Sequence, residues 1–371
     1  MNKCFLFLAG AVCLTAAFSL CVIGCGDILP PLYGDKDGGH EENENGGDKD
    51  NNEEDGGNQG GSGGGSDGGS GKFVWYVSSK GSASNSGTEV QSPLPSVNSA
   101  LDKIKKIYRG GSWPAGESAV IVIRGVITAS GYLGANESMV EITGAGAYPP
   151  IILKGDPVDG GVLNAGRKNG EDGRVLFITN NKVTLAEKLT LTGGNQLWGG
   201  AVCVGTNGAE SEGEFIMAGG EISGNKGASG GAVIIYKGSM TMTGGVIKEN
   251  RNNYNNNPGS GGGVYVNDYT SFTMTGGIIE LNGGDDKAEK GGGIFINGRG
   301  AVYMSGGEIR LNTSVQQGGG VYIATLGVFN MSGGLITGNT SGEGGGVYAS
   351  PYGSGGKFDK TGGEVSGNNP E

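Results

Sequence analysis

The chain is poor in the side chains on which many hydrolases and metal sites depend. It has one histidine, His40, and five cysteines, of which only Cys203 lies beyond residue 25. A Ser-His-Asp or Cys-His nucleophile and a histidine-based zinc site are therefore not expected in the body of the protein. Residues 73–371 cannot form an internal disulfide either, so their stability has to come from packing.

Positive charge and proline are also scarce. The 26 Lys and Arg face 37 Asp and Glu, which gives a net charge of −11. Residues 26–72 contribute −9 of this charge and Lys3 contributes +1, so residues 73–371 carry −3. Because a nucleic-acid-binding protein needs a basic stripe, nucleic acid is not expected as a partner. Eleven prolines without a Gly-X-Y period exclude collagen, although 82 of the 371 residues are glycine.

Residues 1–25 are predicted to be a targeting segment. Lys3 supplies a positive start, and residues 4–23 carry no charge. The sequence Val22–Cys25 resembles a bacterial lipobox, in which the cysteine is lipidated and becomes the mature N-terminus. Cys21 fits this role less well, because a bulky residue precedes it. The alternative is an uncleaved transmembrane anchor, since about 20 apolar residues can span a bilayer.

Residues 26–72 are predicted to be a disordered tether. They hold twelve acidic residues and three lysines, with abundant Gly, Ser and Asn. Such a composition cannot bury enough apolar surface to offset the entropy of the chain. With a lipid such as palmitate on Cys25, the protein is expected in the bacterial cell envelope, anchored to the outer membrane and exposed at the surface. The membrane is then its first partner.

From about residue 189 onward the chain repeats itself. Gly-Gly pairs begin at residues 193, 219, 244, 276, 306, 333 and 362, so the steps are 26, 25, 32, 30, 27 and 29 residues. A short alternating segment such as Met240–Met242 precedes most pairs, and an aliphatic residue such as Ile247 follows each of the later ones. Three residues after that aliphatic residue comes an asparagine in every repeat: Asn225, Asn250, Asn282, Asn312, Asn339 and Asn368. A Gly-rich entry then leads into another strand, as at residues 261–266.

This repeat predicts an all-β fold, a right-handed parallel β-helix of about ten rungs. Each unit offers strands of alternating pattern with no helical period. A unit cannot bury its apolar face alone, but stacked units can, with equivalent residues aligned about 4.8 Å apart. Glycine permits the sharp corners, and the asparagines are expected to form a structural ladder that satisfies backbone groups there. A β-propeller is the main rival, but the units are short and Gly-rich for one.

The body is predicted to divide into an N-terminal cap, residues 73–115, and the β-helix, residues 116–371. Apolar residues recur at helical spacing from Val97 to Ile107, with Ser96 as N-cap and Gly110 just past the end. This amphipathic helix is expected to close one end of the stack, because an open end exposes unpaired strand edges.

Two parts of the body resemble known families. The segments 76–82, 85–88 and 92–96, followed by the helix, are similar to the N-terminal cap of secreted pectin-lyase-like β-helix proteins. The repeats resemble those of the chlamydial polymorphic outer membrane proteins, whose Gly-Gly-Ala-Ile and Phe-x-x-Asn motifs correspond to residues 230–233 and 222–225. The resemblance implies a surface-exposed, adhesive protein and no particular reaction. That family is anchored by a C-terminal membrane domain, and here the lipid at Cys25 is expected to take over the anchoring.

Candidate catalytic groups are few. Pectin-lyase-like folds often act as polysaccharide lyases or glycosidases, which need a carboxylate cluster with a base or two facing carboxylates. Asp285 and Asp286 are adjacent, and Glu221, Glu308 and Glu364 share one repeat position. The latter are expected to form an acidic column or a solvated face. No catalytic residue, metal ligand or cofactor is assigned.

Two features are candidates for binding. Strand parity places Tyr265, Phe295, Tyr322 and Tyr348 in one column on the outer face, where exposed rings would suit a sugar or an apolar protein patch. The alternative is that the rings stabilise the strands by stacking or lie beneath a loop. The two longest inserts, residues 251–260 and 283–290, fall on consecutive rungs and are either a binding surface or solvent-facing turns.

We therefore expect a non-catalytic surface lipoprotein that displays a rigid β-helix for adhesion or surface structure and has a glycan or protein ligand. The alternative is a carbohydrate-active enzyme, either a polysaccharide lyase or a glycosidase.

Overall fold

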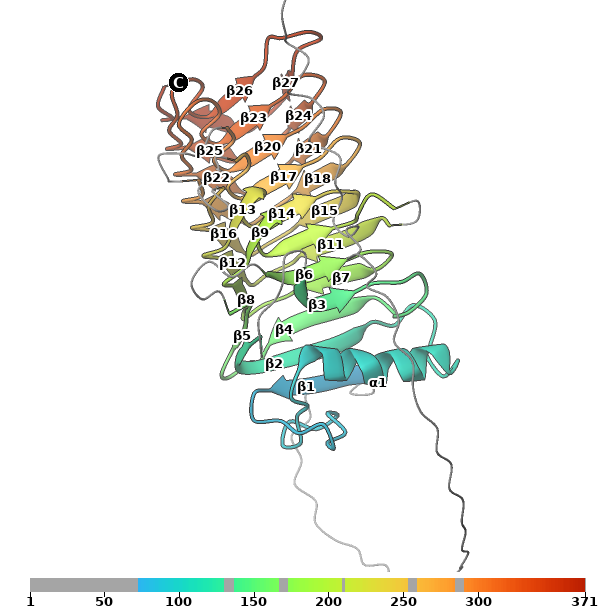
Figure 1. Cartoon of the computed structure of the whole chain (residues 1–371). Coiled ribbons are helices and arrows are strands. Elements are labelled where there is room, and N and C mark those ends of the chain that lie inside the picture. Colours follow the sequence, from blue (N-terminus) through green and yellow to red (C-terminus); the bar gives the residue numbers. More distant parts are fainter. Residues whose placement is uncertain are drawn as a thin grey trace, which may run out of the picture. The chain divides into compact units, whose positions relative to one another are not determined.

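The computed structural model describes residues 73–129, 137–166, 173–208, 211–252, 259–283 and 290–370. These residues form a parallel β-solenoid with a single helix near its N-terminal end (Figure 1). The predicted lipobox with Cys25, the tether, His40 and the pair Asp285 and Asp286 lie outside the described residues. So do the central parts of the two long inserts, residues 253–258 and 284–289.

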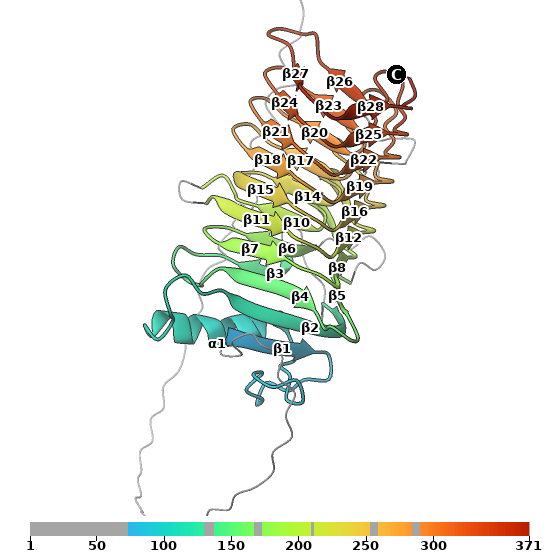
Figure 2. The same cartoon turned by 180° about the vertical axis from the view of Figure 1, so that it is seen from behind.

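The strands pair in parallel with their counterparts one turn away and form three ladders (Figure 2). The first ladder consists of β1 (Val74–Ser78), β2 (Ala119–Thr128), β4 (Ile151–Gly155), β7 (Lys182–Leu185), β11 (Gly213–Met217), β15 (Gly238–Met242), β18 (Ser271–Met274), β21 (Ala301–Met304), β24 (Val328–Met331) and β27 (Lys357–Lys360). The second ladder consists of the end of β2, β5 (Gly161–Asn164), β8 (Leu189–Thr192), β12 (Glu221–Ser223), β16 (Val246–Lys248), β19 (Ile278–Glu280), β22 (Glu308–Arg310), β25 (Leu335–Thr337) and β28 (Glu364–Ser366). The third ladder consists of β3 (Ser138–Ile142), β6 (Arg174–Ile178), β10 (Val202–Val204), β14 (Val233–Ile235), β17 (Val264–Val266), β20 (Ile294–Ile296), β23 (Val321–Ile323) and β26 (Val347–Ala349). A further short pair joins β9 (Asn195–Trp198) to β13 (Lys226–Ser229).

The prediction of a parallel β-helix is confirmed. The strands expected before residue 189 are present, because residues 120–123, 140–142, 151–153, 175–177 and 183–185 all lie in ladder strands. The first ladder has ten strands among the described residues. The number of turns with a strand in all three ladders is smaller than the ten rungs expected. The first turn is incomplete because α1 (Val97–Arg109) follows β1, and no third-ladder strand follows β28 in the described range.

One continuous core runs through the stack. Met242, Met274 and Met304 lie in register on successive strands and are at most 1% exposed. Each methionine reaches beneath the Gly-Gly corner of the next turn. A Cβ at Gly277, for example, would lie 2.5 Å from Cε of Met242, and Gly277 also has a φ of +85°. In the five pairs from residue 244 onward, the second glycine is therefore required both by its left-handed backbone and by the methionine packed against it.

The six asparagines form a buried ladder at the corner that follows the second-ladder strands. In each of the first five, the backbone N–H and the side-chain Nδ2 both donate to Oδ1 of the asparagine on the next turn, at 2.9–3.1 Å. Nδ2 also donates to a core carbonyl of the previous turn, such as Ile247 O for Asn282 at 2.9 Å. The polar groups of the corner are thus satisfied without water.

The N-terminal cap also forms as expected. The side chain of Ser96 accepts a hydrogen bond from Ser99 N, and Gly110 is the C-cap. Val97, Ala100, Leu101 and Ile104 are buried and join the core of the solenoid. Across the described ranges, no helix is long and apolar enough to cross a membrane.

Replacement of one ladder asparagine should destabilise the whole stack. In Asn282→Ala, the N–H and Nδ2 of Asn250 and the carbonyl of Ile247 lose their buried partner. We expect the free energy of unfolding to fall by about 2–4 kcal/mol, measured by urea denaturation. Asn207→Ala, at an exposed turn position, is the control and should change it by less than about 0.5 kcal/mol. Equal midpoints for the two variants would contradict a structural ladder.

Candidate functional site

The aromatic column of the third ladder is a continuous stack of rings. Tyr265, Phe295, Tyr322 and Tyr348 lie in register on β17, β20, β23 and β26. Successive ring centroids are 5.0, 5.0 and 5.5 Å apart, and the interplanar angles are 15°, 12° and 8°. The rings are thus brought together as expected, and the stack stabilises the parallel strands.

The column does not present the open aromatic face that was expected. Phe295 is only 8% exposed and Tyr322 only 6%. The Gly-rich entry of each turn folds back against its own strand, so that a Cβ at Gly291 would lie 3.1 Å from Cα of Phe295. Nζ of Lys290 lies 5.0 Å from the centroid of the Tyr322 ring. Strand parity predicts which side a ring points to, but it does not reveal the segment that covers it.

The end of the column is more exposed but electrostatically unsuited to an anion. Burial raises the pKa of the Tyr348 hydroxyl, and the nearby Glu343 carboxylate raises it further. The carboxylate of Glu343 also accepts a hydrogen bond from Nε2 of Gln317 at 2.9 Å. Stacking thus accounts for the buried Phe295 and Tyr322, whereas Tyr265 and Tyr348 at the two ends of the column are partly exposed.

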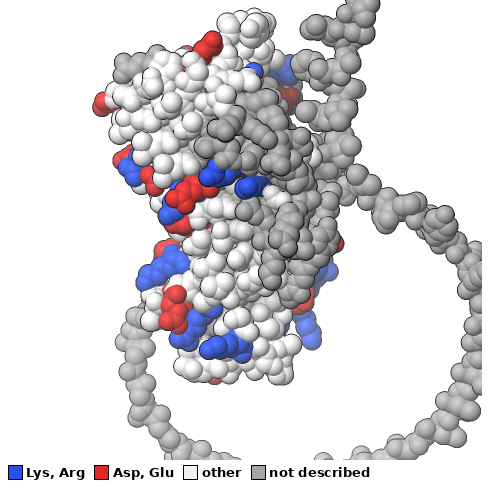
Figure 3. All heavy atoms as spheres, turned by 60° about the vertical axis from the view of Figure 1, so that its left-hand side comes forward, with Lys and Arg blue, Asp and Glu red and all other residues white. Residues whose placement is uncertain are grey.

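The glutamates of the second ladder do not form an acidic column. Glu221, Glu308 and Glu364 share one register position, but apolar residues separate them on the intervening turns. Oε2 of Glu221 lies 3.0 Å from Nζ of Lys248, and Oε2 of Glu308 lies 2.6 Å from Nη1 of Arg310. Figure 3, which brings this side of the solenoid forward, shows acidic and basic side chains lying next to one another. This is a solvated, ion-paired face.

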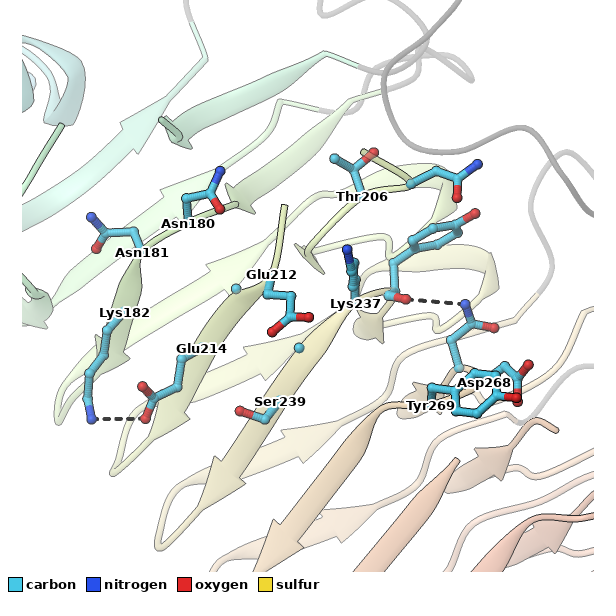
Figure 4. Close-up of a pocket in the computed structure, with 15 residues that line it drawn as sticks. Asn180, Asn181, Lys182, Thr206, Glu212, Glu214, Lys237, Ser239, Asp268 and Tyr269 are labelled. Carbon is cyan, nitrogen blue, oxygen red and sulfur yellow. Dashed lines mark hydrogen bonds and ion pairs between the residues drawn. The ribbon is translucent and has the colours of Figure 1, made fainter. Parts of the chain in front are cut away.

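A groove of about 860 Å³ lies where the third ladder turns into the first ladder. Its floor is formed by the starts of β7, β11 and β15, and its walls by the turns that precede β7, β11 and β18. The lining side chains are almost all polar or aromatic: Asn180, Asn181, Lys182, Thr206, Asn207, Glu212, Glu214, Tyr236, Lys237, Ser239, Asn267, Asp268 and Tyr269. Figure 4 shows Glu214 on β11, Ser239 on the neighbouring β15 and Glu212 in the turn that leads into β11, with Asp268 and Tyr269 on the far side.

The groove results from unequal turn lengths. The connection from β14 to β15 consists only of Tyr236 and Lys237, whereas the neighbouring connections span residues 205–212 and 267–270. The short turn lies low between two longer ones. Gly213 and Gly238 start the strands beneath it and carry no side chain to fill the space.

The charged groups on the floor of the groove are partly paired. Oε1 of Glu214 lies 2.9 Å from Nζ of Lys182. Nζ of Lys237 donates to the carbonyl of Gly208 at 3.1 Å. Glu212 is exposed, and Figure 4 shows its carboxylate between Lys237 and the strand that carries Glu214. The floor therefore combines hydrogen-bond donors and acceptors within a small area.

The far wall is built by hydrogen bonds between turns. Nδ2 of Asn267 donates to the carbonyl of Tyr236 at 3.2 Å, and Asp268 Oδ1 accepts from the backbone N–H of Arg299 at 2.6 Å. The Arg299 guanidinium lies 5.1 Å from the centroid of the Tyr269 ring. Tyr269 itself is 73% exposed. One face of its ring is thus positioned by a cation, while most of the side chain is available to a ligand.

None of these groove residues was selected from the sequence. The available signal was the spacing between the third-ladder segments and the strands that follow them, which is shortest at Tyr236 and Lys237. Within the described residues, no cluster of three or more His, Cys, Asp or Glu side chains is arranged to hold a metal ion.

Comparisons with known proteins are sparse. No protein-family model matches the chain, and no curated protein matches it. Among solved structures, the native GH136 lacto-N-biosidase from Eubacterium ramulus is similar, with a TM-score of 0.33 and 11% sequence identity over 79% of this chain and 68% of that one.

Truncation of a stacked ring should affect stability, because the column is structural. In Phe295→Ala, the stacking contacts with the rings of Tyr265 and Tyr322, whose centroids both lie 5.0 Å away, are lost and a buried cavity remains. We expect the free energy of unfolding to fall by about 3 kcal/mol in urea denaturation. Tyr303→Ala, which removes a ring that is 48% exposed, should cost less than about 1 kcal/mol. Similar losses in both variants would argue against a stabilising column.

Proposed function

We propose that this protein is a surface lipoprotein whose rigid β-solenoid binds a glycan without cleaving it, in the groove between Tyr236 and Tyr269. The observation that carries this proposal is the polar lining of the groove beside an exposed aromatic ring. A protein ligand is the alternative, and an absence of glycan binding in the test below would favour it.

The lining is suited to sugar hydroxyl groups. A hydroxyl both donates and accepts hydrogen bonds, and the groove offers both partners through Asn, Lys, Glu and Asp side chains. The apolar face of a sugar ring packs well on an aromatic ring, which Tyr269 presents at the rim. A groove that is open along one side also admits part of a longer chain, whereas a closed pocket does not.

The state of the carboxylates favours binding over cleavage. A glycosidase needs two carboxyl groups free to act as acid and as base or nucleophile. Glu214 is engaged by Lys182, and Asp268 is engaged by the backbone of Arg299. Glu212 is the one groove carboxylate for which no such contact is found among the described residues. Enzymatic cleavage by Glu212 with Glu214 is the competing function.

The surface location rests on the N-terminal sequence. Lys3, the uncharged residues 4–23 and the lipobox-like Val22–Cys25 support export and lipid attachment. The acidic residues 26–72 would then separate the lipid at Cys25 from the solenoid. A solenoid suits this role because its stacked turns keep the groove rigid at a distance from the membrane.

A glycan array probed with the full chain tests the binding function. We expect selective binding that weakens about tenfold in Tyr269→Ala, because one aromatic contact with the sugar is lost. Tyr352→Ala is the matched control, since Tyr352 is 74% exposed but does not line the groove. Binding that is absent, or that is equally weakened in both variants, would refute the groove as the glycan site.

The same glycans distinguish binding from catalysis. We expect no new reducing ends and no unsaturated products after prolonged incubation with the full chain, with and without Ca²⁺. Reproducible product formation that is lost in Glu212→Gln, while binding is retained, would establish the enzymatic alternative instead.

Lipid attachment is tested by labelling cells with a palmitate analogue. We expect label on the full chain and at least about a tenfold loss of label in Cys25→Ala, because that cysteine would carry the lipid. Cys21→Ala should keep the label. Equal labelling of the Cys25→Ala variant would indicate that the anchor is elsewhere or is the uncleaved apolar segment.

A further inference from the structure

The capping helix α1 carries an unusual excess of positive charge. Lys103, Lys105, Lys106 and Arg109 lie within its last two turns, and Asp102 is its one acidic residue. Its charge of +3 contrasts with the net −3 of residues 73–371. The end of the solenoid that α1 covers is therefore basic, although the body as a whole is acidic.

These cations are not paired with carboxylates. Several lysines and arginines along the stack do lie within 4.0 Å of carboxylates, as in the pairs Lys154–Glu187, Lys182–Glu214 and Lys248–Glu221. None of the four α1 cations has such a partner in the part of the chain that the structure describes. Lys105 instead lies over the Tyr148 ring, 5.5 Å from its centroid.

The helix geometry directs three of the cations away from the core. The buried residues Val97, Ala100, Leu101 and Ile104 define one face of α1. At 100° per residue, Lys106 falls on the opposite face with Asp102 and Arg109 beside it, and the half-buried Lys103 lies on its flank. Lys106 and Arg109 also complement the partial negative charge of the helix C-terminus, but Lys103 lies too far from it to be explained in this way.

An aromatic cluster at the same end of the solenoid packs against the core beside α1. Trp113, just past the helix, lies 4.4 Å from Phe73, 5.9 Å from Trp75 and 6.1 Å from Tyr108 between ring centroids. Ile107, near the end of α1, is 39% exposed. Tryptophan and tyrosine next to lysine and arginine are typical of surfaces at the boundary between lipid and water.

The position of this surface in the fold also favours a membrane. Figure 1 shows α1 beside β1 at the first end of the stack. Phe73, the first described residue, belongs to the same aromatic cluster as Trp113. A chain anchored upstream of Phe73 therefore reaches the solenoid at its basic end.

We propose that the exposed face of α1, with the Trp113 cluster, docks onto an anionic lipid surface. Lys103, Lys106 and Arg109 contact phosphate groups, and the partly exposed Trp113 and Tyr108 lie at headgroup level. This contact orients the solenoid with its basic end toward the bilayer. It is independent of the groove, and it draws on the proposed anchor only to bring the lipid near.

Vesicle sedimentation tests this surface. Full chain carrying Cys25→Ala, which removes the lipid attachment site, is mixed with vesicles of phosphatidylcholine alone or of equimolar phosphatidylcholine and phosphatidylglycerol. We expect phosphatidylglycerol to tighten binding at least about tenfold at low salt, and added salt to reverse the gain. The triple variant Lys103→Gln, Lys106→Gln, Arg109→Gln should lose this preference. The apolar N-terminal segment is present in both proteins, so it does not contribute to the difference.

A charge-matched control makes the result specific. The triple variant Lys154→Gln, Lys248→Gln, Lys357→Gln removes three cations that are paired along the stack, and it should keep the preference for phosphatidylglycerol. The proposal is overturned if the control variant loses the preference for phosphatidylglycerol equally or if the α1 variant keeps it. It is also overturned if the parent Cys25→Ala protein shows no such preference. None of these outcomes affects glycan binding in the groove, so the two proposals fail separately.

Discussion

The structure depends on one constraint: each side chain lies directly over its counterpart from the previous turn. The buried asparagine ladder enforces this register, because from Asn250 onward each Oδ1 accepts two hydrogen bonds from the asparagine of the neighbouring turn. A shift of one residue would leave these donors unsatisfied in the core and would turn Met242 and its counterparts outward. Register is therefore specified by polar and apolar ladders together.

The same constraint explains why the outside of the solenoid is free to vary. The strands occupy fixed positions in the stack, so an insertion changes only the turn that contains it. The groove arises in this way, because the short turn of Tyr236 and Lys237 lies between longer ones. The ion pairs of the second ladder and the basic face of α1 are likewise surface features on an unchanged core. Function on such a scaffold resides in turns and caps.

Much of the fold was predictable because its signals are local and repeated. The Gly-Gly pairs from 219 onward, the methionines and Asn282 with its equivalents recur at matching positions, and Ser96 and Gly110 mark the ends of α1. The pair at 193 does not belong to this series, because it follows the second-ladder strand β8. The site was not predictable in the same way. The burial of Phe295 depends on a folded-back segment, the pairing of Glu221 on Lys248 of the next turn, and the groove on a comparison of three turn lengths. These properties depend on contacts between neighbouring turns, and the sequence of a single repeat does not reveal such contacts.

Hydrogen exchange of individual backbone amides tests the stacking account most directly. The N–H groups of Asn225, Asn250, Asn282, Asn312 and Asn339 each donate to a buried side-chain oxygen one turn away. If the turns share one cooperative core, these amides should exchange as slowly as those of the ladder strands and only through global unfolding. Rapid exchange of these five amides, with protected strands on either side, would show that the corner is open and would contradict the account.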